Sequence, residues 1–416
     1  MRKTRKLSIR FASTALLCGS LFACNSINNN NESLDEQANR IAQDNIIVDG
    51  HIDVPYRVES NWVDVTKATD KGDFDYPRAV QGGLDAPFMS VYVPASLDNS
   101  DASTKLANRL IDSVEAIVGR APDKFALAYS VADVKQNFKD GKISLPMGME
   151  NGSPVQGSLQ TLKHFYERGI RYITLAHSQS NHISDSSYDL RRQWQGLSPF
   201  GKEMVSEMNS LGIMVDISHV SDAAFYQAIE ISRSPVIASH SSLRRFTPGF
   251  ERNMTDDMIK KLGENGGVIM INFGSGFVSP AARLWRDDMA KQQQALIDTF
   301  GDDSAEVIAF SDEYAKNNSY PFANVDTILD HIDHVVKLVG INHVGIGSDY
   351  DGVGDSLPEG LKDVSSFPTL IKGLLGRNYS EADIKKILNE NLLRVWSEVE
   401  MIAAESVNSA QRREAP

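Results

Sequence analysis

Residues 46–53 read Ile46-Ile47-Val48-Asp49-Gly50-His51-Ile52-Asp53. The apolar start of this stretch is typical of a strand buried in a parallel sheet. His51 and Asp53 follow it, and side chains two positions apart in an extended chain point to the same side. In barrel enzymes the carboxyl ends of the strands carry the chemistry. The stretch therefore predicts a strand that delivers a pair of metal ligands to the rim of a barrel.

Seven further strand-like segments follow along the 416 residues. With the first, the predicted strands are 46–50, 87–93, 145–149, 170–175, 213–217, 235–239, 267–272 and 343–347. The predicted helices include 34–44, 103–119, 157–168, 201–211, 221–231 and 255–264. Because strand and helix alternate eight times, the pattern favours an α/β fold of the (β/α)8 TIM-barrel type, with insertions, over a doubly wound sheet.

Two connections between the predicted strands are long. They span 94–144 and 273–342, and the second includes a polar stretch with scattered aromatic residues at 280–323. A long insertion after a barrel strand often forms a lid or a dimer contact. We expect the barrel domain to cover 34–403 and the segment 404–416 to be a frayed tail.

The first 33 residues predict a module outside the fold. Residues 2–10 are basic, and the apolar stretch 11–22 is too short to span a bilayer. Leu21-Phe22-Ala23-Cys24 resembles a bacterial lipobox, in which the cysteine becomes the lipidated first residue. We expect a signal peptide over 1–23, a lipid anchor at Cys24 and a flexible Asn-rich tether over 24–33. An ordinary cleaved signal peptide is the alternative.

Composition narrows the possible partners and metal ligands. The formal net charge is −13, which disfavours a nucleic-acid partner because phosphate binding relies on clustered Lys and Arg. The two cysteines, Cys18 and Cys24, both lie in the signal region. The folded domain therefore has no disulfide and no thiolate metal site, and any metal must be held by His and carboxylates.

Side chains that can bind metal follow six of the eight predicted strands. They are His51, Asp53, Glu150, His177, His219, His240 and Asp349. Imidazoles with carboxylates suit zinc or a similar divalent ion. Seven candidates exceed the needs of one tetrahedral ion, so two ions bridged by a carboxylate would use them better.

Other residues compete for these roles. Asp351 offers a second carboxylate beside Asp349. His331 and His334 share a helix face and could form a ligand pair, but they precede the last strand, so a structural role is favoured. The same structural role is expected for His164, His182 and His343, although His182 lies in the loop after the fourth strand.

Eight blocks between residues 45 and 400 carry a more specific pattern. They lie at 48–53, 82–83 with 90–94, 149–152, 171–177, 216–219, 238–242, 252–253 and 343–352. In this order they resemble the membrane dipeptidase family, the renal-type zinc dipeptidases, as a bacterial lipoprotein member. Asp53 supports this resemblance, because many related barrel hydrolases carry a second His at the equivalent position. The resemblance implies a TIM barrel of the metal-dependent hydrolase type.

The resemblance also implies roles for the metal ligands. His51 and Asp53 would bind the first of two Zn²⁺ ions. His219 and His240 would bind the second, and Glu150 would bridge both.

Three further residues receive roles in the reaction by the same resemblance. Asp349 would contact a bridging hydroxide and handle its proton, and His177 would stabilise the tetrahedral intermediate. Arg252 would hold the terminal carboxylate of the substrate. Arg244 and Arg245 lie in the same loop, but the family pattern matches Arg252.

The implied function is hydrolysis of dipeptides that have a free C-terminal carboxylate, with tolerance of a D-residue at the second position. The lipobox predicts a location in the bacterial cell envelope, lipid-anchored in the outer membrane and facing the periplasm or the exterior. The resemblance adds the expectation of a homodimer. One alternative is a related metal-dependent amidase that acts on β-lactams or N-acyl amino acids. Another is a non-catalytic solute-binding or scaffold lipoprotein, which predicts decayed ligands. The insertion at 280–323 diverges most from the family pattern, so it leaves the substrate range open.

Overall fold

The computed structural model describes residues 32–414, with side chains up to residue 408. The expected signal peptide over 1–23, the lipidation site Cys24 and the tether up to residue 31 lie outside the described residues. The compact unit described below begins at Leu34.

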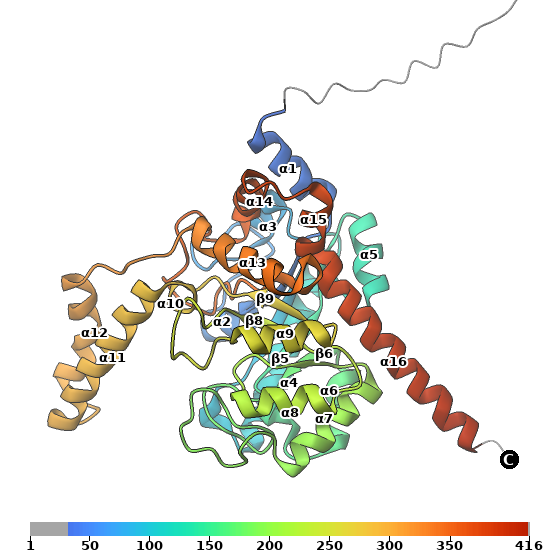
Figure 1. Ribbon diagram of the computed structural model, residues 1–416, viewed down its shortest axis with the longest axis horizontal. Coiled ribbons are helices and arrows are strands. Elements are labelled where there is room, and N and C mark those ends of the chain that lie inside the picture. Colours follow the sequence, from blue (N-terminus) through green and yellow to red (C-terminus); the bar gives the residue numbers. More distant parts are fainter. Residues whose placement is uncertain (1–31, 415–416) are drawn as a thin grey trace, which may run out of the picture. The chain divides into compact units, whose positions relative to one another are not determined.

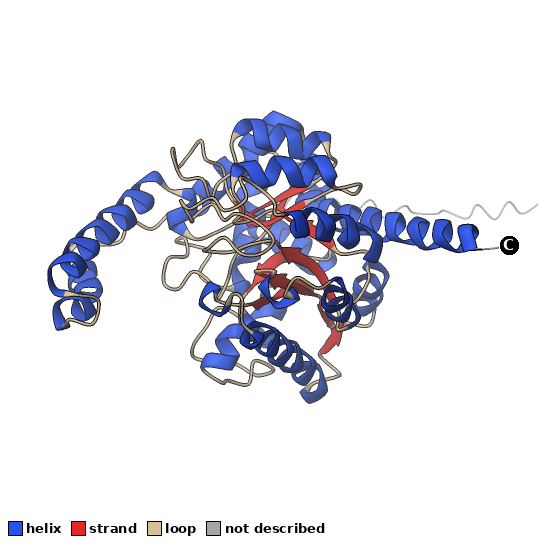
Figure 2. Ribbon diagram, turned by 90° about the horizontal axis from the view of Figure 1, so that it is seen from below, coloured by secondary structure: helices blue, strands red, loops and turns tan. Residues whose placement is uncertain are grey.

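Eight parallel strands form the central sheet (Figure 2), in the order in which they occur along the chain. They are β1 (Val48–Ile52), β2 (Ala86–Tyr92), β5 (Met147–Glu150), β6 (Ile170–Thr174), β7 (Met214–Asp216), β8 (Ile237–Ser241), β9 (Val268–Ile271) and β10 (Val344–Ile346). Each predicted strand overlaps one of these. The prediction of a (β/α)8 barrel is therefore confirmed.

The first and last strands close the barrel. Ile52 forms a parallel bridge with Tyr350, just beyond β10. The Asp53 amide donates to the Tyr350 carbonyl at 2.8 Å, and the Asp349 amide donates to the His51 carbonyl at 3.0 Å. Closure therefore brings the ligand pair after β1 beside the carboxylate after β10, although almost 300 residues separate them.

The barrel is surrounded by helices whose starts are marked in the sequence. The main ones are α1 (Leu34–Asp44), α4 (Asp101–Arg120), α6 (Leu159–Glu167), α7 (Pro199–Leu211), α8 (Asp222–Ile231), α9 (Asp256–Glu264), α13 (Val325–Val339) and α14 (Phe367–Gly376). Side chains of Ser158, Ser198, Ser221 and Thr255 each accept a backbone N–H of the first turn. The six predicted helices agree with the observed bounds to within two residues.

Shorter elements complete the chain. Short helices follow the first strand and the last: α2 (Val54–Ser60), α3 (Tyr76–Gly82) and α15 (Glu381–Lys385). The long connection after β2 holds α4, α5 (Val131–Lys139) and a separate two-stranded parallel sheet of β3 (Phe125–Leu127) and β4 (Ile143–Leu145). The predicted strand 145–149 thus covers the end of β4 as well as β5.

The insertion at 280–323 is a helical hairpin. After α10 (Ser275–Val278), the helices α11 (Pro280–Phe300) and α12 (Ala305–Asn317) run alongside each other at one edge of the barrel domain (Figure 1). The Trp285 ring meets the Tyr314 ring edge-on at 5.0 Å, and the Tyr314 hydroxyl donates to Asp288 at 2.7 Å. Aromatic residues in this polar stretch therefore join the two helices.

The last helix, α16 (Asn391–Glu414), supports the interior of the barrel. Its buried Trp396 lies 5.2 Å from the Phe88 ring, and Phe88 lies 5.3 Å from Tyr172. The helix continues to Glu414, through most of the segment 404–416 for which the sequence predicts a frayed tail. Within residues 32–414, no helix combines the length and the apolar character needed to cross a membrane.

Candidate metal centre

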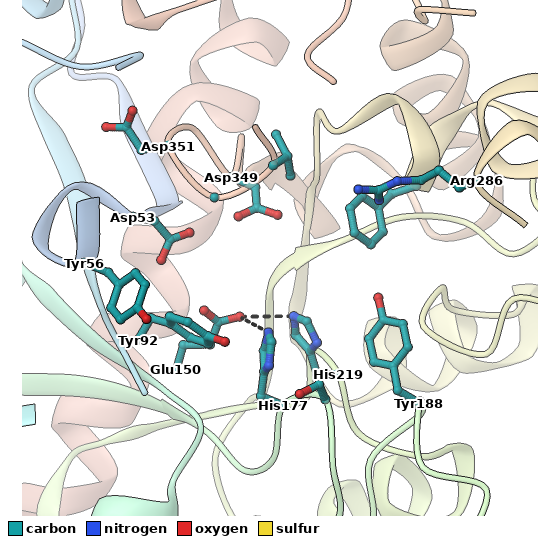
Figure 3. A pocket seen from close by; sticks show the side chains of 14 residues that line it. Asp53, Tyr56, Tyr92, Glu150, His177, Tyr188, His219, Arg286, Asp349 and Asp351 are labelled. Atoms are coloured by element: carbon teal, nitrogen blue, oxygen red, sulfur yellow. Dashed lines mark ion pairs between the residues drawn. The ribbon is translucent and has the colours of Figure 1, made fainter. Parts of the chain in front are cut away.

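A pocket of about 500 Å³ lies at the carboxyl ends of the strands (Figure 3). Such a volume suits a small ligand. Five of the predicted site residues line it: Asp53, Glu150, His177, His219 and Asp349. His51 and His240 are fully buried behind them. The structure therefore brings together all seven predicted ligands, which come from six strands.

Glu150, at the end of β5, lies at the centre of the cluster. One carboxylate oxygen, Oε1, lies 3.1 Å from Nε2 of His219, 3.2 Å from Nε2 of His240 and 3.5 Å from Nε2 of His177. The other, Oε2, lies 3.5 Å from Nε2 of His51. Each oxygen thus faces a different set of imidazoles, which is the arrangement that a bridging carboxylate requires.

A second group gathers around His51. Its Nε2 lies 3.4 Å from Oδ2 of Asp53, and these two residues and Asp349 have ligand atoms within 4.8 Å of one another. The other ring nitrogen, Nδ1, lies 2.8 Å from the Tyr172 hydroxyl, which fixes the ring plane. Asn272 donates to Oδ2 of Asp349 at 2.7 Å.

His219 lies in the turn after β7, and His240 lies within β8. Nε2 of His219 lies 2.8 Å from Nε2 of His240. His219 and Asp349 both have left-handed backbones, with φ of 68° and 64°. Residues other than glycine rarely adopt this conformation, which costs energy and is concentrated at functional sites.

The protonation of His219 and His240 favours metal binding. Burial lowers the pKa of His219 and of His240 well below the usual value, so both imidazoles are neutral near pH 7. Neutral imidazole is the form that binds metal. Burial, and then the neighbouring carboxylate of Asp53, raise the pKa of Asp349 to about 8. Asp349 can therefore hold a proton near neutral pH.

The donor set fits divalent metal ions. His51 Nε2 and Asp53 Oδ1 are buried, and neither has a hydrogen-bond partner within the part of the chain that the structure describes. Buried polar atoms nearly always have partners, so these two point to a ligand between them. Imidazole and carboxylate donors without cysteine are typical of catalytic zinc sites.

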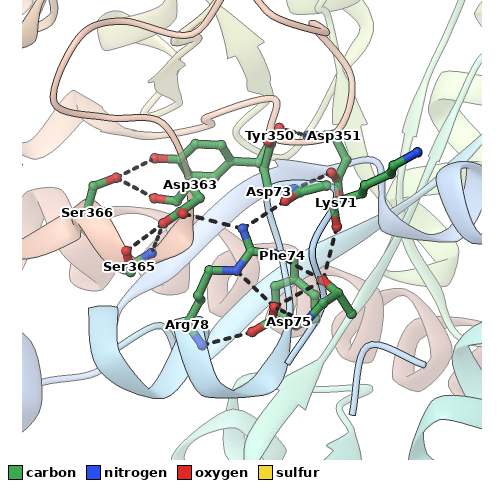
Figure 4. Close-up of polar contacts among 12 residues, drawn as sticks. Lys71, Asp73, Phe74, Asp75, Arg78, Tyr350, Asp351, Asp363, Ser365 and Ser366 are labelled. Carbon is green, nitrogen blue, oxygen red and sulfur yellow. Dashed lines mark hydrogen bonds and ion pairs between the residues drawn. The ribbon is translucent and has the colours of Figure 1, made fainter. Parts of the chain in front are cut away.

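Asp351, the competitor of Asp349, has other partners. Its Oδ2 pairs with Nε of Arg57 at 2.8 Å. Its Oδ1 accepts the Asp73 amide at 2.6 Å, and its own amide donates to Asp73 at 2.8 Å (Figure 4). Asp351 lines the pocket, but these contacts hold the loop after β10 in place. Asp349 is the carboxylate that joins the cluster.

The other histidines lie apart from the cluster. His331, buried on α13, contacts the Val278 carbonyl at 3.0 Å, and His334 contacts Asp256 at 3.0 Å. The rings of His164, His182 and His343 likewise contact Asn108, the Gly157 amide and the Gly267 carbonyl.

Arg252 is buried and is not among the residues that line the pocket. Its guanidinium donates to the Ser241 hydroxyl at 2.8 Å and to the His240 carbonyl at 2.6 Å. Arg244 pairs with Asp222, and Arg245 is exposed. Of the three arginines in this loop, Arg252 is therefore the one that is tied to a predicted metal ligand.

Several residues in or directly behind the pocket were not predicted from the sequence. Asn272 directly follows β9 and Tyr92 ends β2, the two strands to which no ligand was assigned. The strand-end rule that found the other ligands could have found these two. Tyr188, in a loop, and Arg286, on α11, also line the pocket. Neither lies next to a strand, so the sequence gives no comparable signal for them.

Comparisons with known proteins agree with this geometry. The family model described as "Membrane dipeptidase (Peptidase family M19)" matches residues 35–410. Mouse "Dipeptidase 3" is 33% identical over 387 residues, covering 91% of this chain and 69% of the mouse protein. The crystal structure of the probable dipeptidase PvdM from Pseudomonas aeruginosa is 27% identical, with a TM-score of 0.78 over 89% of this chain and 99% of that one.

A further solved structure supports the fold. It is a metallopeptidase from Rhodobacter sphaeroides, liganded with a phosphinate mimic of the dipeptide L-Ala-D-Ala. It is 24% identical and has a TM-score of 0.70, covering 85% of this chain and 99% of that one. The family match covers nearly the whole described chain, so this protein belongs to the membrane dipeptidase family, Peptidase family M19, and is an enzyme of the metallodipeptidase type.

Proposed function

We propose that the protein is a binuclear zinc dipeptidase. The observation that carries this proposal is the position of Glu150, whose two oxygens face His219 and His240 on one side and His51 on the other. His51 and Asp53 would hold one ion, His219 and His240 the other, and Glu150 both. Bound zinc would lower the pKa of a water to about 7 and polarise the scissile carbonyl.

The residues around the metal ligands supply the remaining chemistry. In its carboxylate form, Asp349 would accept a proton from the attacking water, and its raised pKa suits it to hold that proton until it passes to the leaving amine. His177 is the only predicted imidazole with appreciable pocket exposure, at 18% of its side chain, and it stands edge-on to Tyr92 at 4.9 Å. An imidazole N–H there would stabilise the negative charge that develops on the carbonyl oxygen.

The proposed substrates are dipeptides with a free C-terminal carboxylate. Arg252 provides the cation for this carboxylate, because a planar guanidinium binds both oxygens. The structure with an L-Ala-D-Ala mimic belongs to a relative with a similar fold, which supports tolerance of a D-residue at the second position.

A zinc-dependent assay tests the proposal. The purified protein is stripped of metal, reloaded with Zn²⁺ and assayed on Ala-Ala and Ala-D-Ala. We expect two zinc ions per chain and hydrolysis of both dipeptides. Glu150→Gln should retain the fold but lose activity. No hydrolysis of any dipeptide in a small panel would refute the proposal, and faster turnover of β-lactams or N-acyl amino acids would favour the related amidase activity.

We also propose that the enzyme is anchored in the cell envelope through a lipid on Cys24. The support is the lipobox-like sequence 21–24. Fatty-acid labelling of cells that express the full chain should mark the protein, and Cys24→Ser should abolish the label. Labelling that survives this substitution would exclude Cys24 as the anchor.

A further inference from the structure

Arg286 places a positive charge at the wall of the pocket. It lies on α11, within the helical hairpin that interrupts the barrel after β9. Figure 3 shows it on the opposite side of the pocket from Asp53, Tyr56 and Tyr92. The metal-binding carboxylates thus occupy one side of the pocket, and the hairpin contributes a cation to the other.

The Arg286 guanidinium has no acidic partner of its own. Within residues 32–408, no carboxylate oxygen lies within 4.0 Å of it and no hydrogen bond from it is formed. Arg283, one turn earlier on the same helix, pairs with Asp287 and lies over the Phe250 ring at 4.2 Å. A half-buried guanidinium without a counter-charge, facing a ligand pocket, is suited to bind an anionic group of the ligand.

The local packing positions Arg286 for such a role. Its guanidinium carbon lies 5.9 Å from the centre of the Phe277 ring, and that of Arg252 lies 5.6 Å from the same centre. A side chain on Gly276 would collide with the Arg286 stem, since a Cβ there would lie 2.7 Å from its Cδ. The missing side chain at Gly276 therefore lets Arg286 lie against α10, and both cations lie near the Phe277 ring.

Two neighbouring cations fit a ligand end that carries two anionic groups. We propose that Arg286 selects dipeptides whose second residue is acidic, by binding the side-chain carboxylate while Arg252 binds the α-carboxylate. This inference rests on the proposed dipeptidase function, and it assigns the insertion a role in substrate choice. A dipeptide with a neutral second residue offers Arg286 no partner, so its complex with the enzyme lacks one charge-assisted interaction.

The test compares isosteric substrates on the zinc-loaded enzyme. We expect kcat/KM for Ala-Asp to exceed that for Ala-Asn by about 10- to 100-fold, the effect of one charge-assisted hydrogen-bonded pair. Arg286→Ala should abolish this preference by raising KM for Ala-Asp, while Ala-Ala turnover stays within about 3-fold. Arg283→Ala is the matched control, because its guanidinium already has a partner outside the pocket, and it should keep the preference.

Asp-Ala and Asn-Ala form the second arm of the test. We expect no effect of Arg286→Ala on their ratio. A preference that follows an acidic first residue, or one that survives in Arg286→Ala, would overturn the inference. Equal turnover of Ala-Asp and Ala-Asn by an enzyme that cleaves Ala-Ala would overturn it and leave the dipeptidase function standing. An enzyme that cleaves no dipeptide would refute the function itself.

Discussion

The Ser239 hydroxyl lies 2.7 Å from Nδ1 of His240. This hydroxyl has one proton, and it donates that proton to Asp216, a carboxylate 2.6 Å away. The hydroxyl must therefore accept from His240 Nδ1–H, which leaves the lone pair of Nε2 directed at Glu150. Asp216 also accepts the amides of Ser218 and Ser239, so it joins the ends of β7 and β8.

Ser239→Ala should weaken zinc binding. Without the hydroxyl, His240 loses the partner that fixes its tautomer and its ring orientation, and loss of such a partner costs about 10- to 100-fold in metal affinity. Competition with a chelator measures the zinc affinity, and excess zinc should restore activity. Ser242→Ala is the control, because the buried Ser242 hydroxyl has no partner in the described residues. Equal affinities for the two variants would contradict the role of Ser239.

Gly352→Ala should inactivate the enzyme. A Cβ at this position would lie 2.2 Å from Oδ2 of Asp53 and 2.3 Å from Oδ1 of Asp349, so both carboxylates must move. A displacement of this size at the reacting groups costs about 100-fold in kcat/KM. Gly376→Ala, where a Cβ meets nothing within 4 Å, should leave activity unchanged. Steady-state rates of Ala-Ala hydrolysis measure the effect of both substitutions. A fully active Gly352→Ala enzyme would show that the positions of the Asp53 and Asp349 carboxylates are not critical.

Arg57→Ala should destabilise the loop after β10. Arg57 and Asp351 are both largely buried, with side-chain exposures of 14% and 1%. Removing Arg57 leaves the Asp351 charge buried and unpaired beside Asp73, at a cost of about 3 kcal/mol. Arg109→Ala breaks the more exposed pair with Glu59, which is expected to cost less than about 1 kcal/mol. Denaturant unfolding measures the unfolding free energy of both variants. Similar losses of stability in the two would mean that Asp351 finds another partner when Arg57 is removed.

Asp85→Asn should change how stability depends on pH. Asp85 accepts the Ile47 amide at 2.9 Å, and burial raises its pKa to about 7. The folded protein therefore holds this proton more tightly than the unfolded chain, whose pKa is near 3.8. The contribution to stability is complete below pH 3.8 and is lost as the pH rises through 7.

An uncharged Asn keeps an acceptor for the Ile47 amide but does not titrate. Between pH 4 and pH 7, the unfolding free energy of the variant should fall less than that of the unaltered protein. We expect the difference between the two falls to be on the order of 2 kcal/mol after solvent screening. Urea unfolding at several pH values measures this difference. Identical pH profiles for the two proteins would show that Asp85 titrates normally in the fold.

Much of the barrel and its ligands could be predicted because both depend on short-range patterns. Apolar runs mark the strands, and parallel strands place their carboxyl ends on one rim, so ligands far apart in sequence could be grouped before their distances were known. The position of His51 at this rim follows from this rule alone.

Other parts of the site depend on contacts between distant segments. Asp351 competes with Asp349 in the sequence, where the family resemblance favours Asp349, and in the structure the pairing of Asp351 with Arg57 and Asp73 separates the two. Arg286 lies 14 residues after Asn272 on a separate hairpin, and its place in the pocket is set by how α11 packs on α10. No local periodicity encodes such packing.

Trp396, Phe88 and Tyr172 form a continuous series of rings that ends at His51, the first proposed metal ligand along the chain. His51 lies on the first strand, but the aromatic ring at the far end of this series lies 345 residues later, on the last helix. The series is therefore complete only when α16 has been synthesised and has packed against the barrel. A chain that is terminated before α16 would carry every proposed metal ligand but lack the ring at the base of this series.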